Sequence, residues 1–299
     1  MTSQFATSQE CVHNALLPKG IARRIWINWY QGFSGAPFVV QKCVESWIEK
    51  NPTWEVVLLD ENNIGDHIDG DAAHRTRGRL TFQQRSDLLR LALLEKHGGV
   101  WADATTFCTI PLDEWLGDYC ASGFFAFRNP GKDRVLSSWF LAAAKDCPII
   151  GRLHEKLRVY WLDNNFPPIN STRRIIIDWL SSVLNKDVER PRYWFHPFVR
   201  KILRVSPYFA FHYMFERVVS TDDECRAVWA ETKPFSADIP HIVQKMGFFT
   251  RTTDDVLKRL RAGNAPLLKL RWKYNPARYG GGSLIHYVLE GENSPPANN

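Results

Sequence analysis

The sequence lacks several patterns that would assign it to a class of protein directly. It has no apolar run near the roughly 20 residues that a membrane-spanning helix needs. The first residues, MTSQFATSQE, do not have the charged-then-apolar order of a signal peptide. We therefore expect a cytoplasmic protein. No G-x-G-x-x-G follows a predicted strand, which disfavours a nicotinamide-dependent dehydrogenase.

The six cysteines are scattered along the chain without a C-x-x-C pair. This spacing indicates neither a zinc site nor a disulfide framework, so free, structural thiols are expected. Signatures of helix-turn-helix, zinc-finger and RNA-recognition modules are also missing. We therefore expect no nucleic-acid partner, although the net charge of +6 leaves anionic partners open.

Two segments concentrate the positive charge. Segment 190–204 interleaves basic and aromatic residues, and segment 258–278 is rich in Lys and Arg. Basic residues beside aromatic ones suit a membrane interface, which predicts peripheral contact at the inner face of a membrane. The alternative is that these charges form solvated or substrate-facing surfaces.

The most informative stretch is RSDLLRLALLEKHGGVWADATTFC, residues 85–108. Apolar residues recur at helical spacing from Thr81 to His97, and the glycines at 98 and 99 can end a helix in the left-handed conformation. Residues 100–102 then form a short buried strand that delivers Asp103 to its carboxyl end. Ligands bind at this edge of open α/β sheets.

The sequence predicts four polar side chains near the end of this strand. Asp103 and Thr105 face the same way if the segment is extended, and Asp87 and Arg90 share one face of the preceding helix. A carboxylate accepts hydroxyl protons from a sugar, and a guanidinium binds phosphate or hydroxyl oxygens. A sugar together with a diphosphate indicates a nucleotide sugar.

Alternating strand and helix signals predict an α/β fold with a mostly parallel sheet flanked by helices. The predicted strands are 24–29, 54–60, 100–102 and 123–128; the predicted helices are 38–50, 61–67, 81–97 and 134–145. The expected organisation is an N-terminal extension (1–20), a nucleotide-sugar-binding α/β core (21–150), a helical acceptor-side subdomain (151–216), a C-terminal part of the catalytic domain (217–290) and a disordered tail (291–299).

The motifs S-D-L-L-R and G-G-V-W-A-D-A-T resemble the core of glycosyltransferases with the GT-A fold, in particular the capsular polysaccharide synthesis protein family and the related family 32 sugar transferases. The resemblance extends to further blocks between about residues 20 and 275: Ile25-Trp26-Ile27-Asn28-Trp29-Tyr30-Gln31-Gly32, Cys43 to Trp47, Asn51 to Val56, Pro240 to Gln244 and Pro266 to Leu270.

The resemblance implies a GT-A, Rossmann-like sheet with an inserted helical subdomain. It also implies sugar transfer from a nucleotide-diphosphate donor, a UDP-sugar, to a glycan or lipid-linked acceptor in polysaccharide synthesis, with retention at the anomeric carbon. An inverting enzyme would need a carboxylate base, for which Asp133 and Asp222 remain open. The alternative is a catalytically inactive nucleotide-sugar or glycan-binding protein of the same fold.

The resemblance also implies roles for single residues. Trp26 and Trp29 would stack on the base, with core packing as the alternative. Asp87 would accept a sugar hydroxyl and Arg90 would contact the donor sugar or phosphate, although such a helical pair is usually a surface ion pair. Asp103 would contact the ribose or a metal.

Relatives in the wider superfamily carry Asp-x-Asp, whereas this chain has Asp103-Ala104-Thr105. A hydroxyl is a weak ligand for Mn²⁺ or Mg²⁺, so metal affinity should fall unless another group compensates. The capsular family often has this Asp-x-Thr form, which argues against a decayed enzyme and leaves metal dependence open.

Three later residues complete the candidate set. His241 is a candidate for the missing metal ligand, although most lone histidines have no such role. Lys269 is a candidate for neutralising the leaving diphosphate. His212, between apolar rings, is expected in the core.

Overall fold

The computed structural model describes residues 20–68, 80–273 and 282–291. The predicted N-terminal extension and C-terminal tail lie almost entirely outside these ranges. A five-stranded sheet in the order β2-β1-β3-β6-β5 forms the centre. Its strands are β1 (Arg24–Asn28), β2 (Glu55–Leu59), β3 (Gly99–Ala102), β5 (Phe124–Gly131) and β6 (Arg134–Ala143).

The sheet is mostly parallel, as the sequence predicts. β1 pairs in parallel with β2 and β3, while β6 pairs antiparallel with both β3 and β5. Four strands therefore run in one direction and β6 alone runs in the other. The carboxyl ends of β1 and β3 consequently meet at the same edge of the sheet.

Helix α4 (Phe82–His97) and the glycines after it form as predicted. Thr81 caps the helix by accepting from the backbone N–H of Gln84, whose side chain accepts from the backbone N–H of Thr81 in return. Gly98 and Gly99 both have positive φ, 67° and 97°. This backbone conformation turns the chain directly from α4 into β3.

The prediction of a helix over 134–145 was wrong, because Arg134–Ala143 form the strand β6. β6 lies between β3 and β5 and is buried on both faces, since Leu141 packs in one core cluster and Phe140 in the other. A strand buried on both sides has consecutive apolar residues without the period-two pattern of a half-exposed strand. Its sequence is therefore easily mistaken for a buried helix.

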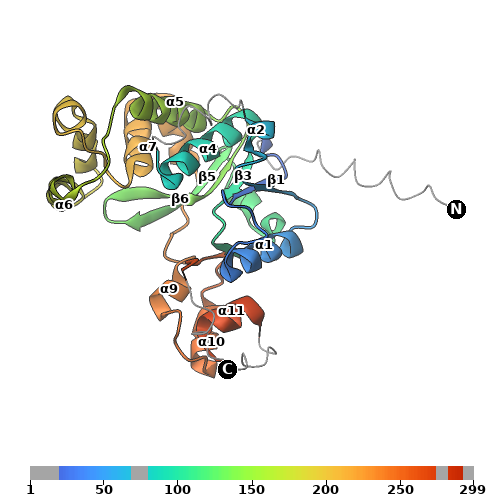
Figure 1. Ribbon diagram of the computed structural model, residues 1–299. Helices are drawn as coiled ribbons and strands as arrows, with labels where there is room; N and C mark the ends of the chain where they lie inside the picture. The colour runs from blue at the N-terminus through green and yellow to red at the C-terminus, as the bar shows by residue number, and fades with distance from the viewer. Residues whose placement is uncertain (1–19, 69–79, 274–281, 292–299) are drawn as a thin grey trace.

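Helices cover both faces of the sheet (Figure 1). α4, α5 (Pro148–Asp163) and α7 (Ala210–Thr221) pack on one face, in a core that contains Trp26 and Trp101. α1 (Phe38–Lys50) packs on the other face against Ile25, Ile27 and Val100. The short helix α2 (Ile64–His67) follows β2 in the chain.

The helical segment after β6 continues the main core and then extends away from it. Three elements follow α5: α6 (Ser171–Leu184), the 3₁₀ helix η4 (Arg190–Phe195) and the π-helical turn η5 (Phe198–Leu203). α8 (Asp223–Glu231) follows α7. Since α5 and α7 share the core cluster of the sheet, this segment is anchored on the α/β core. The predicted domain boundaries remain a prediction.

The C-terminal segment forms a smaller cluster beside α1 (Figure 1). It contains α9 (Ile242–Met246), α10 (Asp254–Ala262), β7 (Leu267–Lys269) and α11 (Leu284–Glu290). β7 pairs antiparallel with β4 (Thr106–Cys108), which follows β3 closely. Two further 3₁₀ turns, η2 (Leu112–Glu114) and η3 (Leu116–Asp118), connect β4 to β5.

Five cysteines lie in the described part of the chain, and all five are buried free thiols, as predicted. Among the helices of the described ranges, none combines the length and the apolar composition that crossing a membrane requires.

Candidate functional site

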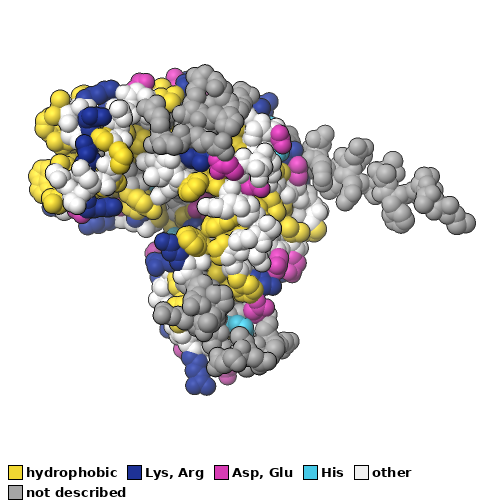
Figure 2. Space-filling view, viewed as in Figure 1, with side chains coloured by type: hydrophobic (Ala, Val, Ile, Leu, Met, Phe, Trp, Pro, Cys, Tyr) yellow, Lys and Arg dark blue, Asp and Glu magenta, His cyan; other side chains and the backbone are white. Residues whose placement is uncertain are grey.

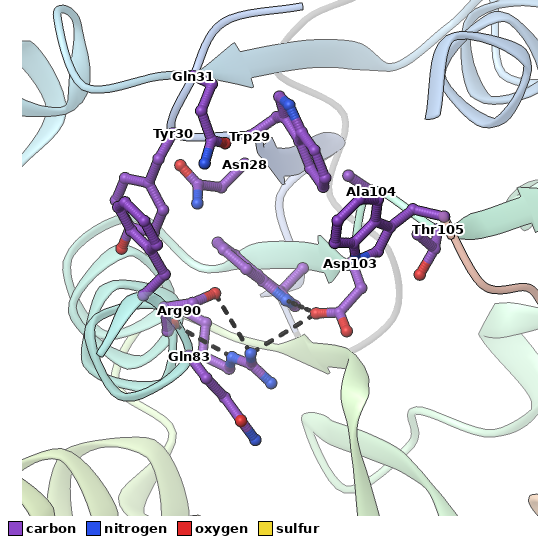
Figure 3. Close-up of a pocket in the computed structure, with 13 residues that line it drawn as sticks. Asn28, Trp29, Tyr30, Gln31, Gln83, Arg90, Asp103, Ala104 and Thr105 are labelled. Carbon is purple, nitrogen blue, oxygen red and sulfur yellow. Dashed lines mark hydrogen bonds and ion pairs between the residues drawn. The ribbon is translucent and has the colours of Figure 1, made fainter. Parts of the chain in front are cut away.

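A cavity of about 310 Å³ opens at the carboxyl ends of β1 and β3 (Figure 3). This is the edge at which the sequence predicts ligand binding. β1 and the loop after it, the first turns of α4, the segment after β3 and one residue after β7 supply the walls. The lining residues are Asn28, Trp29, Tyr30, Gln31, Phe82, Gln83, Ser86, Arg90, Trp101, Asp103, Ala104, Thr105 and Trp272.

Aromatic rings form part of the cavity wall. Trp29 follows β1 directly, and its indole meets that of Trp272 edge-on with 5.8 Å between ring centroids. Tyr30 and Phe82 pair with a centroid distance of 5.3 Å. Trp29 is partly buried and Trp272 is 44% exposed, so a flat ligand ring can reach both indoles.

Asp103 and Thr105 lie on a turn and not in the extended segment that the sequence predicts. The backbone N–H of Thr106 donates to the carbonyl oxygen of Asp103 at 2.9 Å and closes the turn directly after β3. Both side chains nevertheless line the cavity together, with their oxygen atoms on the same side (Figure 3). The two side chains are therefore close together, as predicted, but a turn brings them together and not an extended segment.

Lys269 donates to both of these side chains. Its ammonium nitrogen lies 3.0 Å from Asp103 Oδ2 and 2.8 Å from Thr105 Oγ1. Backbone hydrogen bonds fix its position: Lys269 pairs with Thr106 in the β4–β7 ladder, and the N–H of Leu270 donates to the carbonyl oxygen of Thr105 at 2.8 Å. The tertiary fold thus places the lysine on β7, directly beside the turn.

Two further groups hold the Asp103 carboxylate. The indole N–H of Trp101 donates to Oδ1 at 3.0 Å, and the Arg90 guanidinium lies 3.5 Å from the same oxygen. Burial alone would raise the pKa of Asp103, but the cations of Lys269 and Arg90 and these hydrogen bonds outweigh it and lower the pKa. Asp103 is therefore ionised at neutral pH.

Arg90 connects Asp103 to Asp87. Its guanidinium lies 3.2 Å from Asp87 Oδ1, and Nε donates to the backbone carbonyl of Ser86 at 3.2 Å. Both Asp87 and Arg90 are buried, but only Arg90 lines the cavity. Burial raises the pKa of Asp87 to about 6, while Arg90 opposes this rise. In this arrangement Asp87 positions Arg90, and direct contact between Asp87 and a sugar hydroxyl remains a prediction.

Asn28 is the last residue of β1 and points into the cavity (Figure 3). It is only 9% exposed, and within the described residues its Oδ1 atom has no hydrogen-bond partner. A buried amide oxygen without a partner is costly, which makes this side chain a candidate for ligand recognition.

Trp26 does not lie in the cavity, so the structure does not support the stacking role predicted for it. Its ring is fully buried, and its indole N–H donates to the carbonyl oxygen of Gly98 at 3.0 Å. Successive residues of a strand face opposite sides of the sheet, which puts Trp26 under α4 and in the core. Trp29 lies beyond the end of β1, so the alternation of the strand does not direct its side chain into the core.

The described residues offer no complete set of protein ligands for a divalent cation at Asp103 and Thr105. No group of three or more His, Cys, Asp or Glu side chains in the described ranges could hold a metal ion. His241, the predicted third ligand, donates through Nδ1 to the carbonyl oxygen of Ala237 at 2.6 Å and packs edge-on against Trp139. The group that reaches both Asp103 and Thr105 is the cation of Lys269, which would repel a metal ion.

Three other candidates lie outside the cavity lining. His212 is buried, as predicted, although its Nδ1 atom has no hydrogen-bond partner among the described residues. Burial together with nearby arginine charges lowers its pKa to about 3. Asp133 accepts from the hydroxyl of Tyr213 and pairs with Arg134 at 3.1 Å. Asp222 caps α8 by accepting from the N–H of Cys225 at 3.0 Å. Neither carboxylate is positioned as a base in this cavity.

Sequence reasoning missed several residues of the cavity. Asn28, Tyr30 and Gln31 lie inside the first block that resembles the family, and that block was the available signal. Trp272 follows the Pro266 to Leu270 block by two residues. Ser86 is the first residue of the S-D-L-L-R motif, whereas no local pattern points to Gln83. Both reach the cavity because α4 begins beside it.

Comparison with known proteins identifies a family for most of the region that contains the cavity. The profile of a family described as "Capsular polysaccharide synthesis protein" matches residues 4–169, which include both strands that end at the cavity.

Curated relatives also match. "O-glycosyltransferase braB" from Annulohypoxylon truncatum is 28% identical over 159 residues, which are 46% of this chain and 38% of the relative. "Glycosyltransferase afumC" from Aspergillus fumigatus is 30% identical over 159 residues, 46% of this chain and 40% of the relative. The matched region thus spans less than half the length of these relatives.

Two solved structures are similar over most of the chain. One is "PaToxG Glycosyltransferase", with 13% identity and a TM-score of 0.36, covering 87% of this chain and 91% of that one. The other is the UDP-bound glycosyltransferase domain from the YGT toxin, with 9% identity and a TM-score of 0.44, covering 82% of this chain and 90% of that one.

Proposed function

The chain belongs to the capsular polysaccharide synthesis protein family, and we propose that it is a glycosyltransferase that uses a nucleotide-diphosphate sugar, a UDP-sugar, as donor. One observation carries this proposal. The cavity at the ends of β1 and β3 has the Trp29 and Trp272 indoles in its wall and the Asp103 and Thr105 oxygens beside them, with the Lys269 cation on those oxygens. The names of the relatives agree with it.

In this proposal the base stacks on Trp29 and the ribose and diphosphate extend toward Asp103. An ionised carboxylate accepts hydrogen bonds from ribose hydroxyls, and this is the role we assign to Asp103. The cations of Lys269 and Arg90, both next to Asp103, face the diphosphate. Asn28, with its unsatisfied amide oxygen, recognises a hydrogen-bond donor on the donor substrate.

The reaction breaks the bond between the anomeric carbon and the diphosphate oxygen, which leaves with the bonding electron pair. The acceptor hydroxyl oxygen forms the new bond to the same carbon, and its proton passes to the departing phosphate oxygen. Attack from the face of the leaving group retains the anomeric configuration, in line with the family resemblance. The protein positions both substrates and stabilises the charge that develops on the diphosphate.

We further infer that the sheet is that of the GT-A fold. Its support is the position of the cavity at the carboxyl ends of parallel strands and of Asp103 directly after β3. The competing proposal is a nucleotide-sugar or glycan-binding protein without turnover, which is motivated by the absence of a second carboxylate at position 105.

We propose an anionic membrane surface as the partner of the region around α6. Ile175, Trp179 and Val183 recur every fourth residue on α6 and are 69%, 62% and 38% exposed. On η5, Phe198 and Ile202 are 52% and 68% exposed. Figure 2 shows hydrophobic and basic side chains gathered together at this end of the molecule.

The chemistry of this surface favours a membrane with negative lipids. Exposed basic residues lie among the apolar ones, namely Arg174, Lys186, Arg192, Lys201 and Arg204. Apolar side chains that enter the headgroup region, with cations around them, are typical of interfacial binding. A glycan acceptor on a lipid carrier would then reach the enzyme at the inner face of a membrane, where polysaccharide synthesis would take place.

A donor screen tests the proposed function. The protein is incubated with UDP-, GDP- and CDP-sugars, and the released nucleotide is measured for the wild type and for Asp103→Asn. We expect release from a UDP-sugar that the substitution lowers at least 100-fold. Binding of the nucleotide without any release in the presence of glycan and lipid-linked acceptors would favour the non-catalytic protein.

A further inference from the structure

The position that a metal-dependent transferase would give to a divalent cation is taken here by a lysine side chain. The Lys269 ammonium lies 3.0 Å from Asp103 Oδ2 and 2.8 Å from Thr105 Oγ1, which are the two oxygens that an Asp-x-Thr motif offers to a metal. Both distances are ordinary for hydrogen bonds from an ammonium group.

The lysine is held in this position by the fold. It is on β7, and its side chain is 15% exposed. Its backbone N–H donates to the carbonyl oxygen of Pro240, and its own carbonyl oxygen accepts from the side-chain amide of Gln244 at 3.0 Å. The backbone N–H of Leu270 donates to the carbonyl oxygen of Thr105. These three hydrogen bonds fix the backbone segment that holds the ammonium beside the turn.

The charges around the turn are already balanced without a metal ion. Asp103 pairs with Lys269 and Arg90, and Asp87 pairs with Arg90, so two carboxylates face two cations. A divalent cation at about 2.1 Å from the same two oxygens would lie against the ammonium. Thr105 adds a hydroxyl, which is a poor ligand for Mn²⁺ or Mg²⁺ but a good acceptor for an ammonium group.

We infer that this enzyme binds and transfers its donor without a divalent cation, because Lys269 supplies the positive charge at the diphosphate. The inference rests on the proposed function, since it concerns the same donor site. Thr105 then orients the ammonium through its hydroxyl. The combination of Thr at 105 and Lys at 269 is a matched pair in place of an Asp and a metal ion.

Binding of UDP, measured by calorimetry in EDTA and in Mn²⁺, tests the inference. For the wild type we expect the same dissociation constant in both conditions, after correction for the binding of Mn²⁺ to free UDP. Lys269→Met keeps most of the apolar stem and should weaken binding at least 10-fold in EDTA. The matched control Lys258→Ala removes an exposed cation from α10 and should leave binding unchanged.

The double variant Thr105→Asp/Lys269→Ala provides the reverse test. This variant offers two carboxylates and no ammonium, so we expect UDP binding that requires Mn²⁺. We also expect the electron paramagnetic resonance signal of free Mn²⁺ to be lost when protein and UDP are both present. Wild-type binding that requires Mn²⁺, or a Lys269→Met variant that binds as the wild type does, would overturn the inference. A wild-type protein that binds no nucleotide in either condition would instead contradict the proposed function.

Discussion

The guanidinium of Arg90 lies 3.2 Å from the carboxylate of Asp87, and neither side chain is more than 9% exposed. The pair lies near the middle of α4, where Arg90 lines the cavity. Because Arg90 also reaches Asp103, the pair links the helix to the turn after β3. A buried pair of this kind fixes the position of a functional cation, and removing Arg90 would leave the Asp87 carboxylate buried without its cation.

The ionisation of Asp87 should make stability depend on pH. Burial raises its pKa to about 6, against about 3.9 in an unfolded chain. Between about pH 4 and 6 the folded protein keeps a proton that the unfolded chain has lost, so this group stabilises the fold at low pH and the stabilisation is lost as pH rises.

Urea unfolding of the wild type and of Asp87→Asn at pH 4, 5, 6 and 7 measures this contribution. The wild type minus variant difference in the free energy of unfolding should fall across the window by at most about 3 kcal/mol, since one pKa unit corresponds to about 1.4 kcal/mol. A difference that rises with pH would show that Asp87 is stabilised as a carboxylate instead.

Trp29 should contribute to nucleotide affinity. Its partly buried indole lines the cavity, and stacking of a base on an aromatic ring contributes about 1–3 kcal/mol. Trp29→Ala should therefore weaken UDP binding about 10-fold or more, and Trp29→Phe should retain most of it. Trp179→Ala, on α6, is the control and should bind UDP as the wild type does; an equal loss in both alanine variants would indicate a general effect on folding.

Gly99 should not tolerate a side chain. Its φ is 97°, and a Cβ atom at this residue would lie 2.6 Å from the carbonyl oxygen of Arg24 in β1. Gly99→Ala should lower the free energy of unfolding by about 2 kcal/mol or more, because backbone strain and a backbone clash add. Gly35→Ala has open space around its Cβ position and serves as the control. Equal stability of both variants would mean that β1 and β3 can separate at little cost.

The α6 surface should bind negatively charged lipid. Co-sedimentation with vesicles of phosphatidylcholine and phosphatidylglycerol is expected for the wild type and should weaken as salt increases. Ile175→Ser/Trp179→Ser should reduce the bound fraction at least 5-fold. Ile48→Ser removes an exposed apolar side chain from α1 and is the control. Undiminished binding of the α6 variant would place the membrane contact elsewhere or remove it.

The sequence predicts well what depends on neighbouring residues. The extent of α4, the two glycines and Asp103 at the end of β3 all follow from local patterns. β6 was mistaken for a helix because burial on both faces removes the alternation that identifies a strand. The sequence predicts the same stacking role for Trp26 and Trp29, although only Trp29 lies beyond the strand and can face the cavity.

The arrangement of the site depends on contacts that the sequence does not show. Lys269 meets Asp103 across a separation of 166 residues, through the pairing of β4 with β7. Trp272 reaches Trp29 through the same pairing. Local patterns could suggest Lys269 as a candidate, but only the tertiary fold shows that its ammonium binds the two oxygens of the Asp-x-Thr motif.

The central claim is that one cavity holds the base at Trp29 and the diphosphate at Asp103, Thr105 and Lys269. Calorimetric titration of uridine and of UDP into the wild type, Trp29→Ala and Lys269→Met tests it most directly. We predict that Trp29→Ala weakens binding of both ligands, whereas Lys269→Met weakens binding of UDP and leaves uridine unchanged. Binding of UDP that neither substitution alters would contradict the account.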